Sequence, residues 1–386
     1  MLLEDDDKMK YQYKKQLTKI KRIIQNPGNI KYLSKNKKIN ESGILLVIHE
    51  SQELGASILA LHIAEELVKN GIGVYIVSRQ FGVMNDKYSC VAPTQIALTR
   101  GSYERICKFL YGKGFRKALM ITASTGDLVR ITKKCGFNVV SMIHELGQVV
   151  RMLHLEDATK EMLEFSDKVL FSTSIAKEQI LNVCGVGDND KILIKPQGTY
   201  FNKPSTQEIE EQKCLLKEKY PALESKKVVT GIGNTTERKG FDIFLRTANL
   251  LPQYNFVWAG KKEKYYEEAI EKYGKPSNFV YLGALNSTQL SGLYAIADVY
   301  LMCSRFDTLP STIFEALLFS TPVIGAKCSG GIIDIINNQN GILTDEADCN
   351  QFAKAIDEIM LKTDIKIKEH SNSFEEYVKY VIGIFD

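Results

Sequence analysis

Residues 298–325 read DVYLMCSRFDTLPSTIFEALLFSTPVIG, and this stretch contains the pattern that decides the fold. The apolar run at 298–304 predicts a short buried strand, and the apolar segment at 322–326 predicts a second one. Between them lie a polar loop and a helical run that begins near Pro310, because proline suits the first turn of a helix. A strand, a helix and another strand in this order predict a parallel pair joined by a crossover helix.

The same alternation extends along most of the chain. Further strands are predicted at 43–51, 74–78, 118–123, 138–145, 168–174, 192–198, 228–234, 254–260 and 278–283. Helical patterns separate them, for example at 55–71, 102–112 and 158–166. The alternation pauses over 199–227, a polar and charged stretch with two prolines, and then restarts. Alternating strands and helices predict parallel sheets covered on both faces, so the expected fold class is α/β with two doubly wound Rossmann-like domains.

The length also favours two domains, because 386 residues are too many for one ordinary hydrophobic core. The first residues, MLLEDDDKM, resemble a cloning remnant and take no part in the fold prediction. The predicted division is a tag remnant and basic N-terminal arm at 1–40, an N-terminal domain at 41–200, a linker at 201–227, a C-terminal domain at 228–365 and a C-terminal helix at 366–386.

Composition excludes several classes of protein. Apolar residues make up 44% of the chain and charged residues 25%, as in ordinary globular proteins. No window approaches the roughly 18 uninterrupted apolar residues of a membrane-spanning helix, and the charged start lacks the apolar core of a secretory signal. Eight cysteines without a CxxC pair, and five histidines without HxxxH or HExxH spacing, predict reduced thiols in the cytoplasm and no bound metal.

The segment from Lys8 to Lys38 contains eleven Lys and Arg residues and no acidic residue. Two interpretations stay open. It is either a solvated basic arm or a segment that contacts an anionic membrane surface, where each nearby basic residue contributes about 1 kcal/mol. No nucleic-acid partner is expected.

In open parallel sheets, ligands bind where the carboxyl ends of strands meet loops and helix N-termini. The loop GIGNTTERKGF (231–241) follows a predicted strand and precedes a helix. Its glycines, Gly233 among them, allow an anion to approach the backbone, and Arg238 and Lys239 can neutralise a diphosphate. The alternative is a turn with solvated charges. Because the loop lacks the third glycine of the dinucleotide fingerprint, a dehydrogenase is a weak hypothesis.

Two acidic residues flank the loop of the opening stretch. Asp307 lies in the loop and Glu315 lies just inside the following helix, so both can point into one pocket at the helix N-terminus. Free backbone N–H groups at 309–312 can hold hydroxyls or a phosphate there. The alternative is that the helix dipole favours Glu315 and that Asp307 is an ordinary loop acid.

Glycines end other strands of the second half. Gly260 lies in WAGKK (258–262), and a further glycine lies in YLGAL (281–285). Glycine there allows a flat ligand such as a nucleobase to approach closely. The alternative is that glycine stands at these strand ends only because the chain turns there. The segment SGGIIDII (329–336) is expected to form another loop that opens a helix and presents N–H groups to phosphate oxygens.

The first half offers candidates at its strand ends. Gly55 and Ala56 lie between a predicted strand and a helix, and His144 and Glu145 end another strand. A single histidine is more often structural than catalytic, but the position of His144 at a strand end favours a functional role. His49, also at a strand end, is a lesser candidate.

These loops, in this order, resemble those of the retaining glycosyltransferases of family 4, which have the GT-B fold. The second half matches through RKGFD (238–242), YLGAL (281–285), the opening stretch at 298–325, SGGIIDII (329–336) and NGILT (340–344). The first half matches more loosely, through ELGASILALHIAEELVKNG (53–71), VSMIHEL (140–146) and KPQG (195–198). These three segments look most like bacterial cell-surface polysaccharide enzymes.

The resemblance implies two domains that face a central cleft, with a nucleotide-diphosphate sugar held mainly by the second and an acceptor held mainly by the first. Arg238 and Lys239 would bind the donor diphosphate and stabilise the leaving group electrostatically. Glu315 would bind the ribose hydroxyls. Asp307 stands where the family usually has Glu, and would contact the transferred sugar. The final helix would cross back to the first domain.

The remaining site residues also come from the resemblance. The main chain of Thr308, Leu309, Pro310 and Ser311 would line the sugar and phosphate pocket. Ala284 and Leu285 would pack on the base. Gly55 and Ala56 would approach the diphosphate, although Gly-Ala stands where the family commonly has Gly-Gly, and His144 would contact the donor sugar or acceptor near the reacting centre.

The resulting prediction is a glycosyltransferase that moves a sugar from a nucleotide-diphosphate donor to a glycan or lipid-linked acceptor with retention of configuration. Its expected role is bacterial surface polysaccharide or glycoconjugate biosynthesis, without a metal cofactor. It is expected in the cytoplasm, with the inner face of the cell membrane as a second location if the basic arm binds lipid. The alternatives are an inactive glycosyltransferase-like subunit that serves a partner enzyme, and a GT-B sugar-nucleotide epimerase.

Overall fold

The computed structural model describes residues 38–361 and 373–385, which form two compact units. The first unit comprises the described residues as far as Ile121 together with Leu128–Val139, and the second comprises Thr122–Asp127 and the described residues from Val140 onward. The predicted basic arm and its membrane contact lie outside the described residues. The predicted domain boundaries stay a prediction. Across the described ranges, none of the helices is long and apolar enough to cross a membrane.

The first sheet has seven strands in the order β3-β2-β1-β4-β5-β6-β7. Its strands are β1 (Ile44–Ile48), β2 (Val74–Ser78), β3 (Thr94–Ile96), β4 (Lys117–Ile121), β5 (Asn138–Ile143), β6 (Lys168–Phe171) and β7 (Ile192–Ile194). Strand pairs such as β1–β2 and β5–β6 are parallel, as predicted. The short β3 was not predicted, because three residues are too few to show a period.

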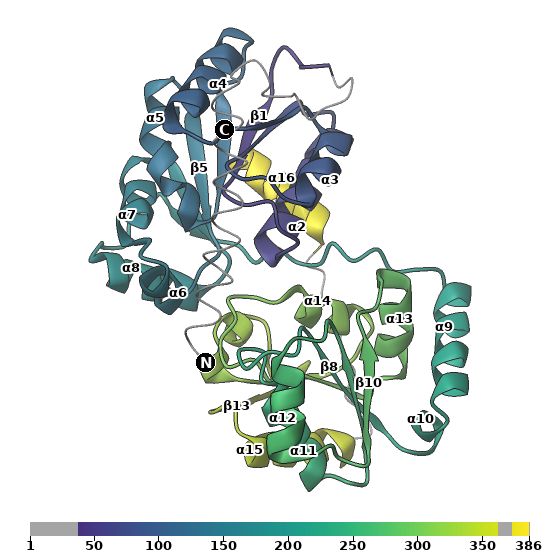
Figure 1. The fold of residues 1–386 in the computed structure, drawn as a ribbon. Helices are drawn as coiled ribbons and strands as arrows, with labels where there is room; N and C mark the ends of the chain where they lie inside the picture. The colour runs from purple at the N-terminus through teal and green to yellow at the C-terminus, as the bar shows by residue number, and fades with distance from the viewer. Residues whose placement is uncertain (1–37, 362–372, 386) are drawn as a thin grey trace. The chain divides into compact units, whose positions relative to one another are not determined.

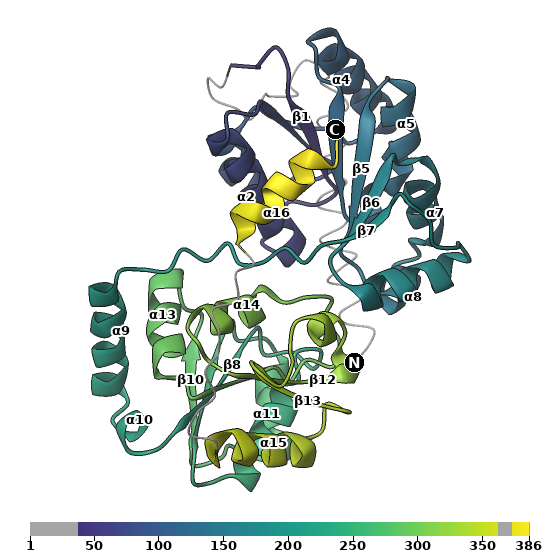
Figure 2. The same ribbon diagram turned by 180° about the vertical axis from the view of Figure 1, so that it is seen from behind.

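Helices connect the strands of this sheet, as a doubly wound fold requires. They are α2 (Gly55–Lys69), α3 (Met84–Val91), α4 (Arg100–Gly112), η2 (Ala123–Leu128), α5 (Val129–Lys134), α6 (Gly147–Met152), α7 (Glu156–Phe165) and α8 (Ser174–Cys184). Within the first unit, α2 and α3 lie on one face of the sheet and α4 and α5 on the other (Figures 1 and 2).

The second sheet has six strands in the order β10-β9-β8-β11-β12-β13. Its elements are β8 (Val228–Ile232), α11 (Phe241–Leu250), β9 (Asn255–Ala259), α12 (Tyr265–Tyr273), β10 (Phe279–Gly283), α13 (Ser287–Ile296), β11 (Val299–Leu301), α14 (Ser311–Leu318), β12 (Val323–Ala326), β13 (Gly341–Thr344) and α15 (Cys349–Leu361). The chain runs from β8 outward in one direction and resumes at β11 on the other side. Ligands of open parallel sheets bind at such a switch point, so the carboxyl ends of β8 and β11 are the place to look for a site.

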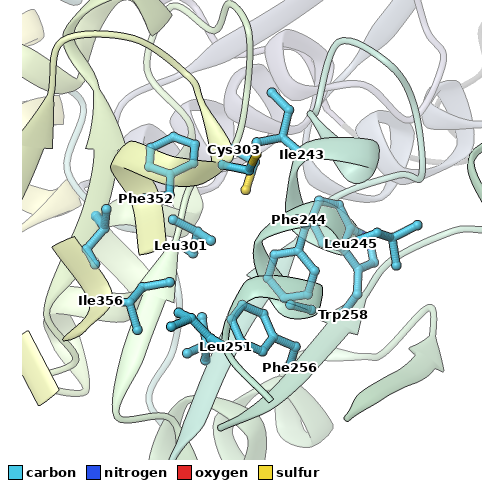
Figure 3. Close-up of a cluster of buried hydrophobic side chains, with 14 of the residues drawn as sticks. Ile243, Phe244, Leu245, Leu251, Phe256, Trp258, Leu301, Cys303, Phe352 and Ile356 are labelled. Carbon is cyan, nitrogen blue, oxygen red and sulfur yellow. The ribbon is translucent and has the colours of Figure 1, made fainter. Parts of the chain in front are cut away.

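Apolar side chains fill both faces of the second sheet. On β9, Phe256 and Trp258 belong to a cluster with α11, α12 and α15 (Figure 3), whereas Val257 and Ala259 belong to another cluster that includes a residue of α13. Successive side chains of a strand point to opposite faces, so an uninterrupted apolar run in the sequence becomes a sheet buried on both sides. This is the physical basis of the predicted parallel architecture.

Two segments differ in detail from the sequence prediction. Residues 201–227, predicted as a linker, contain the helices α9 (Thr206–Lys219) and α10 (Ala222–Ser225). No residue of α9 is fully buried, although Leu216 packs against the cluster that contains Leu293 of α13. Its N-terminus is held by reciprocal hydrogen bonds between Ser205 and Glu208. The helix expected after Ser329 is present only as short 3₁₀ turns, η3 (Lys327–Ser329) and η4 (Gly331–Asp334). The C-terminal helix is α16 (Phe374–Gly383).

Candidate active site

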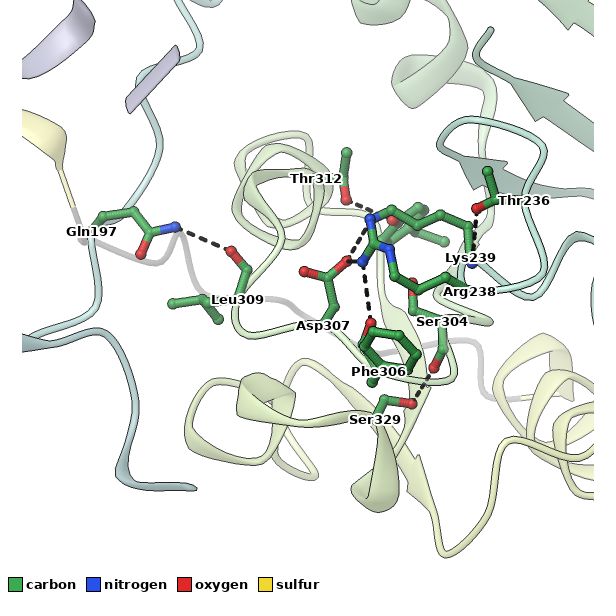
Figure 4. A network of polar contacts seen from close by, with 11 residues as sticks. Gln197, Thr236, Arg238, Lys239, Ser304, Phe306, Asp307, Leu309, Thr312 and Ser329 are labelled. Atoms are coloured by element: carbon green, nitrogen blue, oxygen red, sulfur yellow. Dashed lines mark hydrogen bonds and ion pairs between the residues drawn. The ribbon is translucent and has the colours of Figure 1, made fainter. Parts of the chain in front are cut away.

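The loop after β11 brings Asp307 together with the two cations of the loop after β8. Lys239 Nζ lies 2.5 Å and Arg238 Nη1 3.0 Å from the same oxygen, Asp307 Oδ2 (Figure 4). Arg238 also donates to the carbonyl oxygen of Phe306 at 3.2 Å. The structure therefore joins three of the predicted residues at the switch point of the second sheet.

Burial and the neighbouring charges shift the pKa of the Asp307 carboxyl in opposite directions. Burial alone would raise the pKa of its carboxyl, but the charges of Lys239 and Arg238 outweigh burial and lower that pKa below the ordinary 3.8. Asp307 is therefore ionised at neutral pH. Any anion that binds Arg238 and Lys239 must therefore share these two cations with Asp307 or displace its carboxylate.

A second ion pair, which the sequence pattern did not indicate, holds the two loops against each other. Arg305 donates to both carboxylate oxygens of Asp242 at 2.8 Å, and its Nη1 also donates to the carbonyl oxygen of Glu237 at 2.5 Å. The backbone N–H of Arg305 donates to the carbonyl oxygen of Arg238 at 2.8 Å. Both residues of the pair lie in the quoted motifs SRFD and RKGFD, but only the fold shows that they meet.

A third loop, residues 329–331, packs against the backbone of Asp307. The Asp307 N–H donates to the carbonyl oxygen of Ser329 at 2.7 Å, and Ser329 Oγ donates to the carbonyl oxygen of Ser304 at 2.5 Å. Gly330 has φ +124°, and a Cβ there would lie 2.2 Å from the Asp307 carbonyl oxygen. Glycine is required at this position because the two backbones approach too closely for a side chain. The SGG segment thus packs against the Asp307 loop through its backbone.

Glu315 lies inside α14, as predicted, but its carboxylate has different partners from that of Asp307. It is buried and accepts a hydrogen bond from Tyr294 Oη at 2.9 Å. Burial raises the pKa of Glu315, and hydrogen bonds from Ser311 and Tyr294 only partly offset that effect. Pro310 is the N-cap of α14, so the predicted helix start is confirmed. The main chain from Thr308 to Pro310 connects Asp307 to Ser311, the first residue of α14.

The glycines at the ends of β8, β9 and β10 form one continuous backbone edge. The Gly260 N–H donates to the carbonyl oxygen of Gly283 at 2.8 Å, and a Cβ at Gly260 would lie 2.0 Å from the carbonyl oxygen of Gly233. Trp258 Nε1 donates to that same Gly233 oxygen at 2.8 Å. Close backbone approach therefore explains Gly260, whereas Gly283 is explained by its positive φ of +77°. Beyond this edge Ala284 is exposed, and Leu285 is half-buried against the core.

The candidates of the first half lie in both units. Gly55 and Ala56 begin α2 in the first unit, and a Cβ at Gly55 would meet nothing within 4 Å. His49 Nε2 lies 3.7 Å from Glu50 Oε2, in the same unit. In the second unit, Glu145 accepts hydrogen bonds from the backbone N–H groups of Ala123 and His144, which indicates a structural role for this carboxylate.

His144 directly follows β5 and its Nε2 is buried. Burial lowers the pKa of this imidazole to about 4, so the ring is neutral at neutral pH. A neutral imidazole has one N–H donor and one acceptor nitrogen. The residue can therefore exchange hydrogen bonds with an uncharged group.

Comparisons with known proteins relate the part of the chain that contains these loops to glycosyltransferases. The family model described as glycosyl transferases group 1 matches residues 213–380. The alpha-galactosylglucosyldiacylglycerol synthase of Streptococcus pneumoniae is 33% identical over 105 residues, which cover 25% of this chain and 28% of that protein. The lipopolysaccharide core biosynthesis glycosyltransferase LpsE of Rhizobium meliloti is 25% identical over 154 residues, 39% of this chain and 44% of that protein. The chain thus spans less than half the length of these curated relatives.

Solved structures show the fold over a longer range. The crystal structure of Anabaena Alr3699/HepE in complex with UDP superposes with a TM-score of 0.73 and 17% sequence identity, covering 89% of this chain and 97% of that one. Residues 213–380, which contain Arg238, Lys239, Asp307 and Glu315, thus match the family model of glycosyl transferases group 1, in a chain with the two Rossmann-like parallel sheets of the GT-B fold.

Proposed function

We propose that this protein transfers a sugar from a nucleotide-diphosphate donor to a glycan or lipid-linked acceptor with retention of configuration. The observation that carries the proposal is the convergence of Arg238 and Lys239 on Asp307 at the switch point of the second sheet. Two neighbouring cations on the loop after β8 match the charge of a diphosphate, and they need only exchange one anionic partner for another. The solved structures of Anabaena Alr3699/HepE with UDP and with UDP-glucose support a uridine-diphosphate sugar as the first donor to test.

Each residue has a proposed role in this reaction. Arg238 and Lys239 stabilise the charge that develops on the leaving diphosphate, in place of a metal ion. Asp307 contacts the transferred sugar, and Glu315 binds the ribose hydroxyls. The free N–H groups of the first turn of α14 bind sugar or phosphate oxygens. His144, neutral at physiological pH, hydrogen-bonds the sugar near the reacting centre.

The acceptor is proposed from the relatives. One of them is a diacylglycerol glycolipid synthase and another acts in lipopolysaccharide core biosynthesis. Both names support a lipid-linked acceptor and a role in bacterial glycoconjugate biosynthesis, at the inner face of the cell membrane. Contact of residues 8–38 with anionic lipid belongs to the same proposal, and co-sedimentation with anionic vesicles before and after deletion of this segment tests it. Absence of binding in both forms would refute the contact.

Donor binding is tested first by thermal stabilisation with a panel of nucleotide sugars. A donor at 100 times its dissociation constant should stabilise the protein by about 2.7 kcal/mol. Release of nucleoside diphosphate is then measured with lipid and glycan acceptors, with and without EDTA. We expect Glu315→Ala to abolish release and EDTA to leave it unchanged. Unchanged turnover in Glu315→Ala would refute the assignment of this pocket, and conversion of donor without any acceptor would favour an epimerase.

A further inference from the structure

Three buried polar atoms at one edge of the first sheet have no hydrogen-bond partner among the described residues. They are His144 Nε2, Ser172 Oγ and Gln197 Oε1. His144 directly follows β5, Ser172 directly follows β6, and Gln197 comes three residues after the end of β7. Buried polar groups are nearly always paired, because burying one without a partner is unfavourable. Three such atoms just after three neighbouring strands indicate hydrogen-bond partners from outside the chain, which the polar groups of a ligand can supply in place of water.

The strand register places these residues next to one another. The last paired residues of β5 and β6 are Ile143 and Phe171, so the following positions, His144 and Ser172, lie opposite each other. Phe171 also pairs with Ile194 of β7, and Gln197 follows three positions later. In parallel strands, the carboxyl ends meet at the same edge of the sheet, and opposite residues face the same side. The three side chains therefore gather at the carboxyl edge of β5–β6–β7.

This edge lies against the loop that carries Asp307. Gln197 Nε2 donates to the carbonyl oxygen of Leu309 at 3.1 Å, next to Asp307 in Figure 4. A Cβ at Gly331 would lie 2.0 Å from the Thr308 carbonyl oxygen and 2.3 Å from the side chain of Thr173, the neighbour of Ser172. All these residues belong to the second unit. The unpaired atoms thus lie beside the proposed sugar and diphosphate site.

The chemistry of the three groups restricts the ligand. An amide oxygen such as Gln197 Oε1 only accepts hydrogen bonds, so its partner must carry a hydrogen-bond donor. The Ser172 hydroxyl donates and accepts, and the imidazole of His144 is neutral because of its burial. A phosphate oxygen without a proton cannot donate to the amide. Sugar hydroxyls both donate and accept, and can therefore satisfy all three groups.

We propose that His144, Ser172 and Gln197 form a subsite that hydrogen-bonds the hydroxyl groups of a sugar ring, with Ser172 and Gln197 as specificity-determining residues. The inference rests on the proposed function and assigns the substrate group that this edge recognises. The sugar is either the one transferred from the donor or the one on the acceptor, since both have the same chemistry.

The test is Ser172→Ala, with Ser141→Ala as its matched control. The Ser141 hydroxyl is also buried, on β5, but it is hydrogen-bonded to Ser166 Oγ at 2.7 Å. Removing an unpaired hydroxyl should leave the melting temperature of the free protein unchanged or raise it, whereas Ser141→Ala should lower it. Loss of one hydrogen bond to substrate should reduce kcat/KM of Ser172→Ala by about 3- to 10-fold. Ser141→Ala should keep the kcat/KM of the unchanged protein.

Thermal shifts with UDP-glucose, UDP-galactose and GDP-mannose are each compared with the shift given by the free nucleoside diphosphate. The comparison shows whether the subsite binds the transferred sugar of the donor or the sugar of the acceptor. If the subsite binds the transferred sugar, Ser172→Ala loses the extra stabilisation that the sugar gives over the free diphosphate. If it binds the acceptor sugar, these shifts stay the same and KM for the acceptor rises. A Ser172→Ala protein that is destabilised, or whose kcat/KM and shifts equal those of the unchanged protein, overturns the subsite alone. Failure of the unchanged protein to bind or turn over any nucleotide sugar overturns the proposed function and the subsite with it.

Discussion

The largely buried ion pair between Lys239 and Asp307 should contribute more to stability than an exposed pair of nearly the same length. Lys239 Nζ lies 2.5 Å from Asp307 Oδ2, with side chains 18% and 16% exposed. On α4, Lys108 Nζ lies 2.6 Å from Glu104 Oε1, with side chains 68% and 45% exposed. Water screens the second pair, so most exposed pairs of this kind contribute little. The comparison isolates burial as the cause.

The size of the effect follows from what remains after Lys239→Met. Removing one partner of a buried pair costs about 3–5 kcal/mol, because the other charge stays buried without compensation. Here Arg238 Nη1 remains 3.0 Å from the same carboxylate oxygen, although its side chain is 44% exposed and partly screened. We therefore expect a reduced loss of about 1–3 kcal/mol in the free energy of unfolding. Lys108→Met should show no measurable loss.

The chain offers a local probe for this measurement. Its single tryptophan, Trp258, is buried in the core of the second sheet, so its fluorescence during urea denaturation reports the unfolding of the sheet that carries the pair. The midpoint of the transition should fall in Lys239→Met with an unchanged slope. Equal midpoints for the two methionine variants would refute the reasoning that burial decides the strength of the pair.

The same pair should give a defined dependence on pH. Lys239 and Arg238 lower the pKa of Asp307 in the folded state below 3.8, so the stability they contribute is present above that value and is lost as pH falls through the lowered pKa. The difference between the unchanged protein and Lys239→Met should therefore stay constant from neutral pH down to about pH 5. A difference that already disappears in that range would contradict an ionised Asp307.

Three further predictions concern neighbouring residues. Gly330→Ala should destabilise the protein by at least about 2 kcal/mol in urea denaturation. The reason is that φ is +124° at this position and the new Cβ would lie 2.2 Å from the Asp307 carbonyl oxygen. An unchanged free energy of unfolding would contradict this close approach. Arg305→Lys should lose about 1 kcal/mol, since lysine cannot bond both oxygens of Asp242, and a double-mutant cycle with Asp242→Asn checks this coupling. The pKa of His144 falls from 6.5 to about 4 on folding, so the unfolded state binds more protons than the folded state between these pH values. The free energy of unfolding should therefore decline as pH falls from 6.5 to 4, and His144→Gln should make this decline smaller.

The sequence by itself determined the architecture, because strands and helices follow from local periodicity. Apolar runs of strand length separated by helical patterns predicted parallel sheets buried on both faces, and both sheets are present. Pro310 marked the start of α14, since its effect on the backbone is local. The rule that ligands collect at strand ends also singled out the loops of Arg238, Lys239 and Asp307, and the structure shows that these three residues meet.

The tertiary structure alone decided which of these groups meet. Asp307 is paired with Lys239 and Arg238, which lie 68 and 69 positions before it, whereas the carboxylate of Glu315 faces Tyr294. The ion pair of Arg305 with a residue 63 positions away has no local signal either. The unpaired atoms of His144, Ser172 and Gln197 can be identified only from burial and strand register in the structure. A sequence pattern does not show whether a polar atom has a hydrogen-bond partner. Contacts over such separations depend on how strands are ordered in a sheet, and no short stretch of sequence contains that order.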